Sequence, residues 1–556
     1  MRPTTVMRLS IACLLVSMAL IISRGLSAQT LSGQTEMTQV SRPDSPPQPT
    51  KKSTPPPEGY FPYPAGLIPA DLNAEITRVN REIDGIENEA LQQWHQLPIN
   101  PGTAKRQVEI LGKLEQFDKN LSVNRNMACT FCHMPYTGFS GPIPSLNATT
   151  VAYPGSVRYR FGKRKPQGYT YAPYYPVLQF NETQQNFYGG QFWDLRATGY
   201  KIQSADSEQA QGPPHDTQEM GLPDTACVVY RLSQAEYRPL FETVWGVQAF
   251  DIKWPHDVEQ VCSTPAGASV FGGNQTPLDL KPEDRGQANA TYDQYAHAVT
   301  AYEYAPDTSP FSSKFDAYLA GQAQLTQTEQ AGYNLFRGKA NCNSCHLDGR
   351  ATTLTAGQTD NGKAASVAPL FTDFTSSNLG LPKNPRNPFY FQNVPDSYGF
   401  TPNPAGMNFK DLGVGLFLRS LSGTNPDVAN WGPLAPQFDG FMQVSTCRNV
   451  DMRPRPNFVK AYMHNGYLKS LKEVVHFYNT RDKQGYAQNV TSGNCAPGTI
   501  EKVNCWPTPE VPQTKDMTVG NLGLTDQEED QIVAFLQTLT DGYTKPYTDF
   551  NTYTGP

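Results

Sequence analysis

Two five-residue segments of this sequence have residue types and a spacing that could hold a redox cofactor. Residues 129–133 and residues 342–346 each read Cys-x-x-Cys-His. At this spacing two thiols can bond to the vinyl groups of one haem, and the next imidazole can reach its iron. One copy alone would also fit a redox dithiol or half of a zinc site, but two copies favour two haem c groups. The thiols would be Cys129, Cys132, Cys342 and Cys345, and the iron ligands His133 and His346.

The sequence around the first segment predicts the helices that position it. Helical patterns cover residues 71–94 and 103–117, and another returns near residues 287–303. Between residues 134 and 191 the chain is rich in Pro, Gly and Tyr, which is typical of loops packed over a cofactor.

The second segment repeats this order. Thr326 and Glu329 form a capping box before it, and Thr525 and Glu528 form another before the amphipathic run 532–539. Helix, haem loop, distal loops and closing helix follow one another in a small c-type cytochrome. The sequence therefore predicts a mainly α fold with extensive irregular loops and two c-type cytochrome domains.

The chain of 556 residues has room for several domains. The expected segments are a signal peptide (1–28), a disordered Pro-rich linker (29–70), an N-terminal haem domain (71–310), a C-terminal haem domain (311–545) and a tail (546–556).

The first segment has the order of a secretory signal. Arg2 and Arg8 precede the apolar stretch 9–22, and Ala28 ends a plausible cleavage site. The apolar stretch is short for a membrane span. We expect export to the periplasm or beyond, cleavage near Ala28 and no stable membrane insertion; an uncleaved anchor is the alternative.

The net charge narrows the choice of partners. It is −6 for the whole chain and about −9 without residues 1–28, which contain three arginines and no acid. An acidic body would attract a basic soluble cytochrome and repel nucleic acid. Solubility alone would explain the same charge.

Five cysteines remain beside Cys13 and the two haem segments. Covalent haem attachment takes place outside the cytoplasm, where the remaining thiols would be oxidised. We expect the close pair Cys495 and Cys505 to form a disulfide, then Cys227 with Cys262, which leaves Cys447 free. The sequence alone does not fix this connectivity.

Several ordered strings around both segments resemble one family, the bacterial dihaem cytochrome c peroxidases and their relative MauG, which matures a tryptophylquinone. The resemblance covers roughly residues 100–545. The strings are Phe-Trp-Asp at 192–194, Glu-Gln-Ala-Gln-Gly-Pro at 208–213, Glu-Met-Gly at 219–221, Tyr-Met-His-Asn-Gly at 462–466 and Val-Val-His-Phe-Tyr at 474–478.

The resemblance implies that peroxide reacts at the N-terminal haem and that the C-terminal haem transfers electrons. Gln209 and Glu219, ten residues apart, would line the peroxide pocket, and Trp193 would lie between the haems. A carboxylate over the iron can accept a proton from bound peroxide and return it to the leaving oxygen, and an amide can orient it. The alternatives are a surface Glu219 and a Trp193 buried only for its area.

The histidines also distinguish members of this family. Many dihaem peroxidases place a His over the N-terminal haem, but no His lies between His133 and Trp193. That haem should therefore be five-coordinate or water-bound. His215 could reach the pocket, although a plain surface histidine is the expectation.

The second ligand of the C-terminal haem is implied in the same way. Fourteen residues after His464, where peroxidases of the family usually carry a Met and MauG a Tyr, stands Tyr478. A phenolate stabilises ferric iron and lowers its potential relative to a thioether. The alternative is a packed Tyr478 with Met442 or Met452 as ligand, and His476 would point from another helix face.

Two departures from the family pattern stand out. The positions that bind interdomain calcium in the family are Tyr174 and Val459 here, so calcium is doubtful. A longer segment, about residues 250–284, holds Cys262 and could reshape access.

The resemblance implies an oxidoreductase of the cytochrome-c peroxidase type, which reduces hydrogen peroxide to water with electrons from a small cytochrome c or cupredoxin. The alternative is a MauG-like enzyme that uses peroxide to make a high-valent dihaem state and oxidises a protein or organic substrate. A non-catalytic dihaem electron carrier would have two six-coordinate irons, and a rubber-cleaving oxygenase would carry an apolar residue in place of Glu219. The oligomeric state stays open, a homodimer included.

Overall fold

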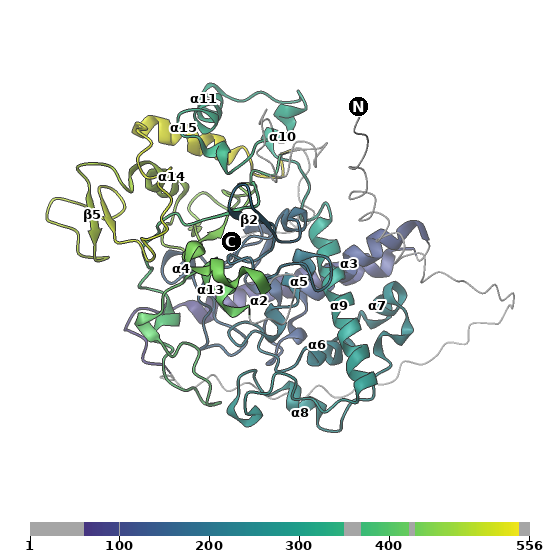
Figure 1. The fold of residues 1–556 in the computed structure, drawn as a ribbon. Helices are drawn as coiled ribbons and strands as arrows, with labels where there is room; N and C mark the ends of the chain where they lie inside the picture. Colours follow the sequence, from purple (N-terminus) through teal and green to yellow (C-terminus); the bar gives the residue numbers. More distant parts are fainter. Residues whose placement is uncertain (1–60, 99–100, 350–368, 422–428, 544–556) are drawn as a thin grey trace, which may run out of the picture.

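The computed structural model describes residues 61–98, 101–349, 369–421 and 429–543. The predicted signal peptide, most of the predicted linker and the C-terminal tail lie outside these ranges. Helices and irregular loops dominate the described chain (Figure 1), which confirms the predicted fold class. None of the helices within these ranges is both long enough and apolar enough to cross a membrane.

The N-terminal half extends to the end of α9. The helices α2 (Leu72–Gln96) and α3 (Ala104–Phe117) precede the first Cys-x-x-Cys-His segment, and α9 (Pro282–Tyr304) closes the half. The helices predicted from periodicity are therefore present. The short helices between them are α4 (Pro144–Ala148), α5 (Ala205–Ala210), α6 (Thr225–Leu232), α7 (Arg238–Trp245) and α8 (Val258–Cys262).

The C-terminal half contains the second segment between α11 (Gln327–Arg337) and α15 (Asp526–Gln537). Both predicted capping boxes are formed at the starts of these helices, where a Thr hydroxyl and a Glu carboxylate each accept a backbone N–H of the other residue. The remaining helices are α10 (Lys314–Leu319), α13 (Val414–Ser420) and α14 (Leu471–Thr480).

Each half brings its entry helix and its closing helix together at a glycine. A Cβ added to Gly112 of α3 would lie 1.9 Å from the carbonyl oxygen of Ala298 in α9. A Cβ added to Gly332 of α11 would lie 1.8 Å from the carbonyl oxygen of Gln531 in α15. Only glycine permits such close backbones. The repeated crossing supports the two cytochrome domains, which lie apart in Figure 1.

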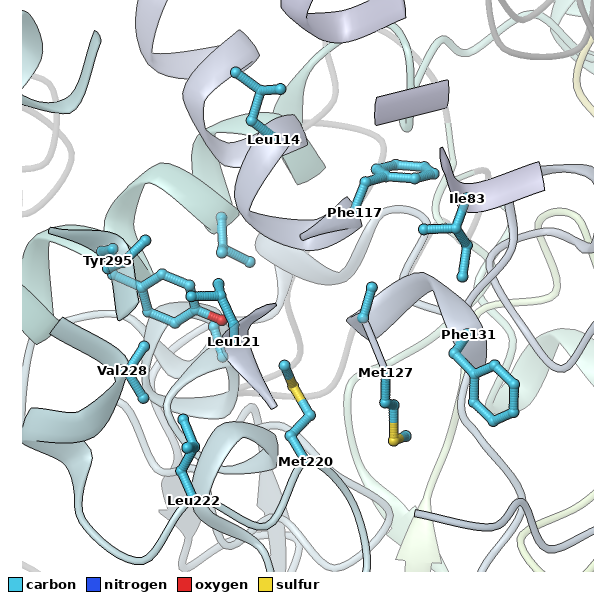
Figure 2. Packing of buried hydrophobic residues seen from close by; sticks show 14 of the residues in the cluster. Ile83, Leu114, Phe117, Leu121, Met127, Phe131, Met220, Leu222, Val228 and Tyr295 are labelled. Atoms are coloured by element: carbon cyan, nitrogen blue, oxygen red, sulfur yellow. The ribbon is translucent and has the colours of Figure 1, made fainter. Parts of the chain in front are cut away.

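Each half also has a separate apolar core. In the N-terminal core, Leu114 and Phe117 of α3 and Tyr295 of α9 lie around the first haem segment, represented by Phe131 (Figure 2). The strands form three small pairs. These pairs are β1 (Gln179–Asn181) with β2 (Asn186–Tyr188), β3 (Ser376–Ser377) with β4 (Met442–Gln443), both antiparallel, and β5 (Ala487–Val490) with β6 (Cys505–Pro507), parallel.

Residues 61–70 differ from the disordered linker that was expected to reach residue 70. Phe61 and Leu67 are buried, and the Tyr63 hydroxyl donates a hydrogen bond of 2.7 Å to the carbonyl of Tyr159. These side chains bury apolar area, which a disordered linker would not do.

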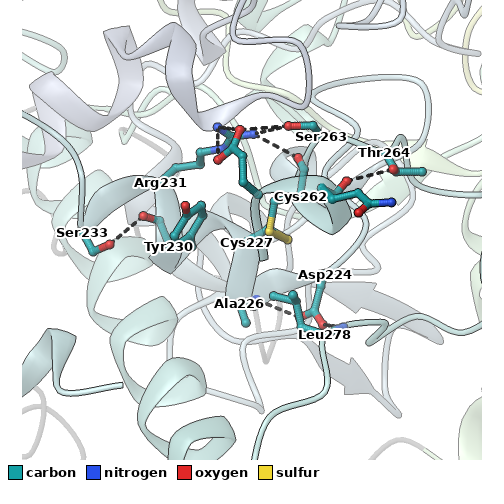
Figure 3. The surroundings of a disulfide bond; sticks show 12 residues. Asp224, Ala226, Cys227, Tyr230, Arg231, Ser233, Cys262, Ser263, Thr264 and Leu278 are labelled. Atoms are coloured by element: carbon teal, nitrogen blue, oxygen red, sulfur yellow. Dashed lines mark hydrogen bonds and ion pairs between the residues drawn. A yellow bond between two sulfur atoms is a disulfide. The ribbon is translucent and has the colours of Figure 1, made fainter. Parts of the chain in front are cut away.

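Both expected disulfides are formed, Cys227–Cys262 and Cys495–Cys505, and Cys447 is free. The first bond ties the extra segment, residues 250–284, to α6 (Figure 3). Beside it, Arg231 of α6 donates 3.1 Å hydrogen bonds to the carbonyl of Cys262 and to the carboxylate of Glu259. The extra segment is therefore held covalently and electrostatically.

Candidate active site

The two histidines that follow the thiol pairs have matching partners. The Nδ1 atom of His133 lies 3.0 Å from the carbonyl oxygen of Phe139, and that of His346 lies 3.0 Å from the carbonyl oxygen of Phe371. Burial lowers the pKa of both imidazoles, so both are neutral. A neutral ring that donates through Nδ1 presents Nε2 to a metal.

The two phenylalanines that accept these bonds share an unusual backbone. Phe139 has a φ of 53° and Phe371 a φ of 52°, in the left-handed region that bulky residues seldom adopt. Each donates its N–H to the carbonyl of the residue directly after the histidine, at 3.0 Å to Met134 and 3.1 Å to Leu347. The same pair of backbone contacts thus fixes the imidazole in both halves.

The residues around the second segment fit a covalently attached haem. A cavity of about 280 Å³ adjoins both thiols and His346, and most of its other lining side chains are apolar. The hydroxyl of Tyr462, which also lines it, has no hydrogen-bond partner among the described residues. Neither this thiol pair nor the first forms a disulfide, so all four thiols can bond to haem.

Glu219 lines a second cavity, of about 250 Å³, in the N-terminal half. The loop that follows α5 builds most of its wall. The other lining residues are Arg196, Gly212, Pro213, His215, Asp216 and Thr217. The predicted acid–base residue therefore faces a small polar pocket, and His215 stands at its wall.

The loop that lines the pocket contacts the first haem segment. The Sδ atom of Met220, the residue after Glu219, lies 4.0 Å from the Sγ atom of Cys129. Burial raises the pKa of the Cys132 thiol, and the negative charge of Glu219 raises it further. The carboxylate is thus close enough to the first thiol pair to act on it electrostatically.

The Glu219 carboxyl holds its proton more tightly than an ordinary glutamic acid. Burial, followed by the charge of Asp216, raises its pKa to about 8, while Arg196 and Lys163 act in the opposite direction. A carboxyl with a pKa near neutrality can both accept and donate a proton, as the predicted chemistry requires.

Arg196 is a pocket residue that sequence reasoning missed. Its guanidinium lies 3.6 Å over the ring of Phe192 and donates a 2.8 Å hydrogen bond to Asp194. Burial alone would raise the pKa of Asp194, but Arg164 and Arg196 hold it well below its usual value. The only local signal was a basic residue two positions after the acid of the Phe-Trp-Asp string.

Gln209 is not brought together with Glu219. It lies on α5, half-buried, and its carbonyl accepts the N–H of Gly212 at 2.9 Å. Its side chain is not among those that line the pocket, and within the described chain no hydrogen bond joins it to Glu219.

Trp193 lies at the wall of the cavity beside the second segment. Its Nε1–H donates a 3.1 Å hydrogen bond to the carbonyl of Lys165, and its ring centre is 6.3 Å from that of His464. A few residues after Lys165, the Tyr169 ring lies 5.4 Å from the ring of His133. Trp193 and Lys165 both line the cavity beside the second segment, and the chain from Lys165 continues to Tyr169, which contacts His133.

Tyr478 of α14 lines the cavity beside the second segment, together with Met442. Met452 belongs to the core of the N-terminal half instead. Burial raises the pKa of the Tyr478 hydroxyl, and nearby thiolates would raise it further. His476 points away, as expected, because its Nδ1 lies 2.9 Å from Glu529. Of the ligands expected from the sequence, Tyr478 and Met442 line the cavity, and Met463 and His464 line it as well.

A buried ammonium occupies the boundary between the halves near Val459, one of the two calcium-associated positions. Lys460 donates hydrogen bonds of 2.8, 3.0 and 2.9 Å to the carbonyls of Thr137, Asn449 and Met452. The carbonyl of Thr137 belongs to the N-terminal half, so this single cation ties the two halves together. Within the described ranges no group of three His, Cys, Asp or Glu residues could hold a metal ion.

The chain is similar to known proteins over most of its length. Residues 106–324 match the family model "Di-haem cytochrome c peroxidase". The chain is 26% identical to the methylamine utilization protein MauG of Paracoccus denitrificans over 438 residues, which are 77% of this chain and 87% of that protein. It is 25% identical to the cytochrome-c peroxidase IdrP1 of Denitromonas iodatirespirans, covering 79% of this chain and 83% of that protein.

A solved structure shares the fold. The diheme peroxidase BthA from Burkholderia thailandensis aligns with a TM-score of 0.53 and 24% identity, over 80% of this chain and 87% of that chain. The repeated haem segments, the family match and the shared fold lead to one conclusion. The chain carries two haem c groups and is similar over most of its length to the bacterial dihaem cytochrome c peroxidases and MauG.

Proposed function

We propose that this exported dihaem oxidoreductase reduces hydrogen peroxide to water in the Glu219 pocket. Electrons come from a small cytochrome c or cupredoxin and enter through the second haem. The observation that carries the proposal is Glu219 itself, a carboxyl with a raised pKa in a small polar cavity beside the first haem segment. Hydrogen peroxide takes up two protons and two electrons and gives two water molecules.

The haem iron, when bound, supplies the position at which the oxygen–oxygen bond breaks. Glu219 accepts the proton of the inner peroxide oxygen and then donates it to the outer oxygen, which leaves as water. Such a positioned group typically contributes about 10²–10⁴-fold to a rate. The raised pKa of Glu219 suits both directions of this transfer.

The other pocket residues orient the small substrate. Arg196 has N–H groups beyond those that bond Asp194, so it can stabilise negative charge that develops on the leaving oxygen. We assign Gln209, which lies on α5 just before the loop that lines the pocket, to the orientation of Glu219.

Electron delivery is assigned to the second half. His346 and Tyr478, which line the same cavity, would hold the second iron, and Trp193 would relay electrons between the halves. A phenolate ligand lowers the potential of that iron relative to a thioether.

The MauG-like activity is the second candidate, and Tyr478 is the observation that favours it. A low-potential partner haem is suited to giving electrons to the peroxide site and later taking them from a protein or organic substrate. The intact Glu219 pocket suits both activities, because both begin with cleavage of peroxide.

The test uses the protein with both haems, the variant Glu219→Gln and, as a control, Glu283→Gln, an exposed acid on α9. We expect Glu219→Gln to slow the reaction with peroxide in a stopped-flow instrument by roughly 10²-fold or more. An unchanged rate would mean that another group moves the proton. The control should react like the unmodified protein.

The same experiment separates the two activities. Turnover that requires a reduced small cytochrome supports peroxide reduction. A long-lived oxidised product formed from the diferric protein alone supports oxidation of a further substrate. If neither oxidation state reacts, the electron carrier remains as the interpretation.

A further inference from the structure

Two buried arginines lie behind the peroxide pocket, and each pairs with a carboxylate from the other half of the chain. Arg160 donates from Nε to Asp396 at 2.7 Å, and neither side chain is exposed. Arg164 donates from Nε and Nη2 to the two carboxylate oxygens of Asp411, both at 2.7 Å. Asp396 and Asp411 belong to the C-terminal half, whereas the pocket belongs to the N-terminal half.

Arg160 connects Asp396 to the loop that carries Glu219. Its Nη1 donates to the carbonyl of Thr217 at 3.2 Å and to that of Ala266 at 2.8 Å. Ala266 in turn donates its N–H to the carbonyl of Gly221 at 2.8 Å. The guanidinium is therefore tied to the chain on both sides of Glu219.

The turn before Arg160 also contacts the backbone of Glu219. Ser156 donates its N–H to the Glu219 carbonyl at 2.7 Å, and Gly155 donates its N–H to the carbonyl of Arg160 at 2.8 Å. A Cβ added to Gly155 would lie 2.7 Å from the Glu219 carbonyl oxygen. A displacement of Arg160 would thus be transmitted to Glu219 through rigid backbone contacts.

Arg164 connects Asp411 to the other charged group of the pocket. Its Nη1 donates to Asp194 at 2.7 Å, and Asp194 accepts the guanidinium of Arg196 at 2.8 Å. Arg196 and Glu219 line the same cavity. Each pocket group is therefore held by a buried arginine, and each arginine by an aspartate of the C-terminal half.

Stability alone does not account for these pairs. Burying two charges costs a desolvation penalty that their attraction barely offsets, and apolar residues of similar size often serve as well. Among the described residues, moreover, the buried Nη2 of Arg160 has no hydrogen-bond partner. What charged pairs provide, and apolar contacts do not, is a fixed direction for the groups that they hold.

We propose that Asp396 and Asp411, acting through Arg160 and Arg164, are positioning residues for Glu219 and Arg196. The C-terminal half then has two functions: it holds the second haem, and it completes the peroxide pocket of the first. This inference rests on the proposed function of Glu219. It makes the peroxide reaction depend on contacts that lie outside the N-terminal half.

The test measures Asp396→Asn and Asp411→Asn in the protein that carries both haems. We expect each variant to slow the reaction with peroxide by about tenfold or more, because a displaced catalytic group loses its aligned geometry. Amide hydrogen exchange should become faster at Ser156, Met220 and Gly221 in Asp396→Asn, with the absorption of the second haem unchanged. The matched control is Asp316→Asn, which removes the partner of another buried arginine, Arg448, away from the pocket.

The outcomes separate this inference from the proposed function. If Asp396→Asn and Asp411→Asn lose only stability, as Asp316→Asn does, and keep the unmodified rate and exchange, the inference is wrong. If Glu219→Gln itself has no effect, the proposed function fails first, and hydrogen exchange still decides whether the aspartates hold the loop. Should Asp396→Asn not fold, Arg160→Lys replaces it, because lysine keeps the charge but offers one nitrogen where Arg160 bonds Asp396 from Nε and the two carbonyls from Nη1. An unmodified rate and exchange in Arg160→Lys would equally overturn the inference.

Discussion

The two Cys-x-x-Cys-His segments share a backbone arrangement and differ in exposure. In the first, Thr130 and Phe131 between the thiols are fully buried, at 0% exposure each. In the second, Asn343 is half-buried and Ser344 is exposed. The first segment is therefore sealed inside its half, whereas the second is partly open to solvent.

This difference fits the proposed function. The loop next to the sealed segment lines the pocket that we assign to peroxide, a small molecule. The open segment is the part that we assign to electron entry, and electrons cross a protein surface without a bound substrate. Four measurements test the contrast between the two segments.

The largest effect is expected from truncating the sealed segment. Phe131→Ala should cost about 3–5 kcal/mol of unfolding free energy, because it leaves a cavity where the ring packs against Tyr153 and the guanidinium of Arg158. Ser344→Ala, the matching change in the open segment, should stay within about 0.5 kcal/mol. Denaturant unfolding of the haem-loaded proteins measures both. Equal losses of unfolding free energy in the two variants would mean that the two segments do not differ in how much burial stabilises them.

The pH dependence of the peroxide reaction should belong to the sealed half alone. The ionised form of Glu219 accepts the first proton, and burial raises its pKa to about 8. The rate constant should therefore rise about tenfold per pH unit below that value and level off above it. Stopped-flow profiles measure this, and Glu219→Gln should give a flat profile. A slope that survives in Glu219→Gln would assign the titration to another group.

Tyr478→Phe should change the spectrum of one haem only. If the phenolate is an iron ligand, its loss should change the low-spin signal of the second haem and leave the signal of the first haem unchanged. Electron paramagnetic resonance and absorption spectra measure this, and Tyr486→Phe serves as a control on a tyrosine outside the cavity. An unaltered spectrum would mean that Tyr478 is not an iron ligand and that the ligand is another cavity-lining side chain, such as Met442.

The smallest effect is expected at the open surface. Ser344→Lys should change the rate of electron delivery from a charged donor by a few fold at low ionic strength, because rim charges act mainly on association. Added salt should abolish the difference. Single-turnover reaction with peroxide serves as the internal control and should be unaffected. A change in that reaction instead would place Ser344 in the path to the sealed haem.

Features with local sequence signals could be predicted. The boxes at Thr326 and Thr525 begin their helices because a capping box is formed by residues three apart. The haem thiols and the close cysteine pair Cys495 and Cys505 were readable for the same reason.

Features set by distant contacts could not be predicted. Arg160 and Asp396 are 236 positions apart, and the sequence around neither residue predicts that they form an ion pair. The spacing between Gln209 and Glu219 predicts that they share a pocket, but of the two only Glu219 is among the residues that line it. The end of the predicted linker was wrong because the partner of Tyr63 lies 96 residues away.

The burial of Thr130 and Phe131 also has a consequence for how the protein is made. A haem-attaching enzyme has to reach Cys129 and Cys132 before α3 and α9 close around them, so loading of the first haem and folding of its half form one event. In the second pair both thiols are half-buried, whereas Cys132 of the first pair is buried. A host with too little of this machinery should therefore accumulate a species that holds only the C-terminal haem, visible as half the expected haem per chain by mass spectrometry.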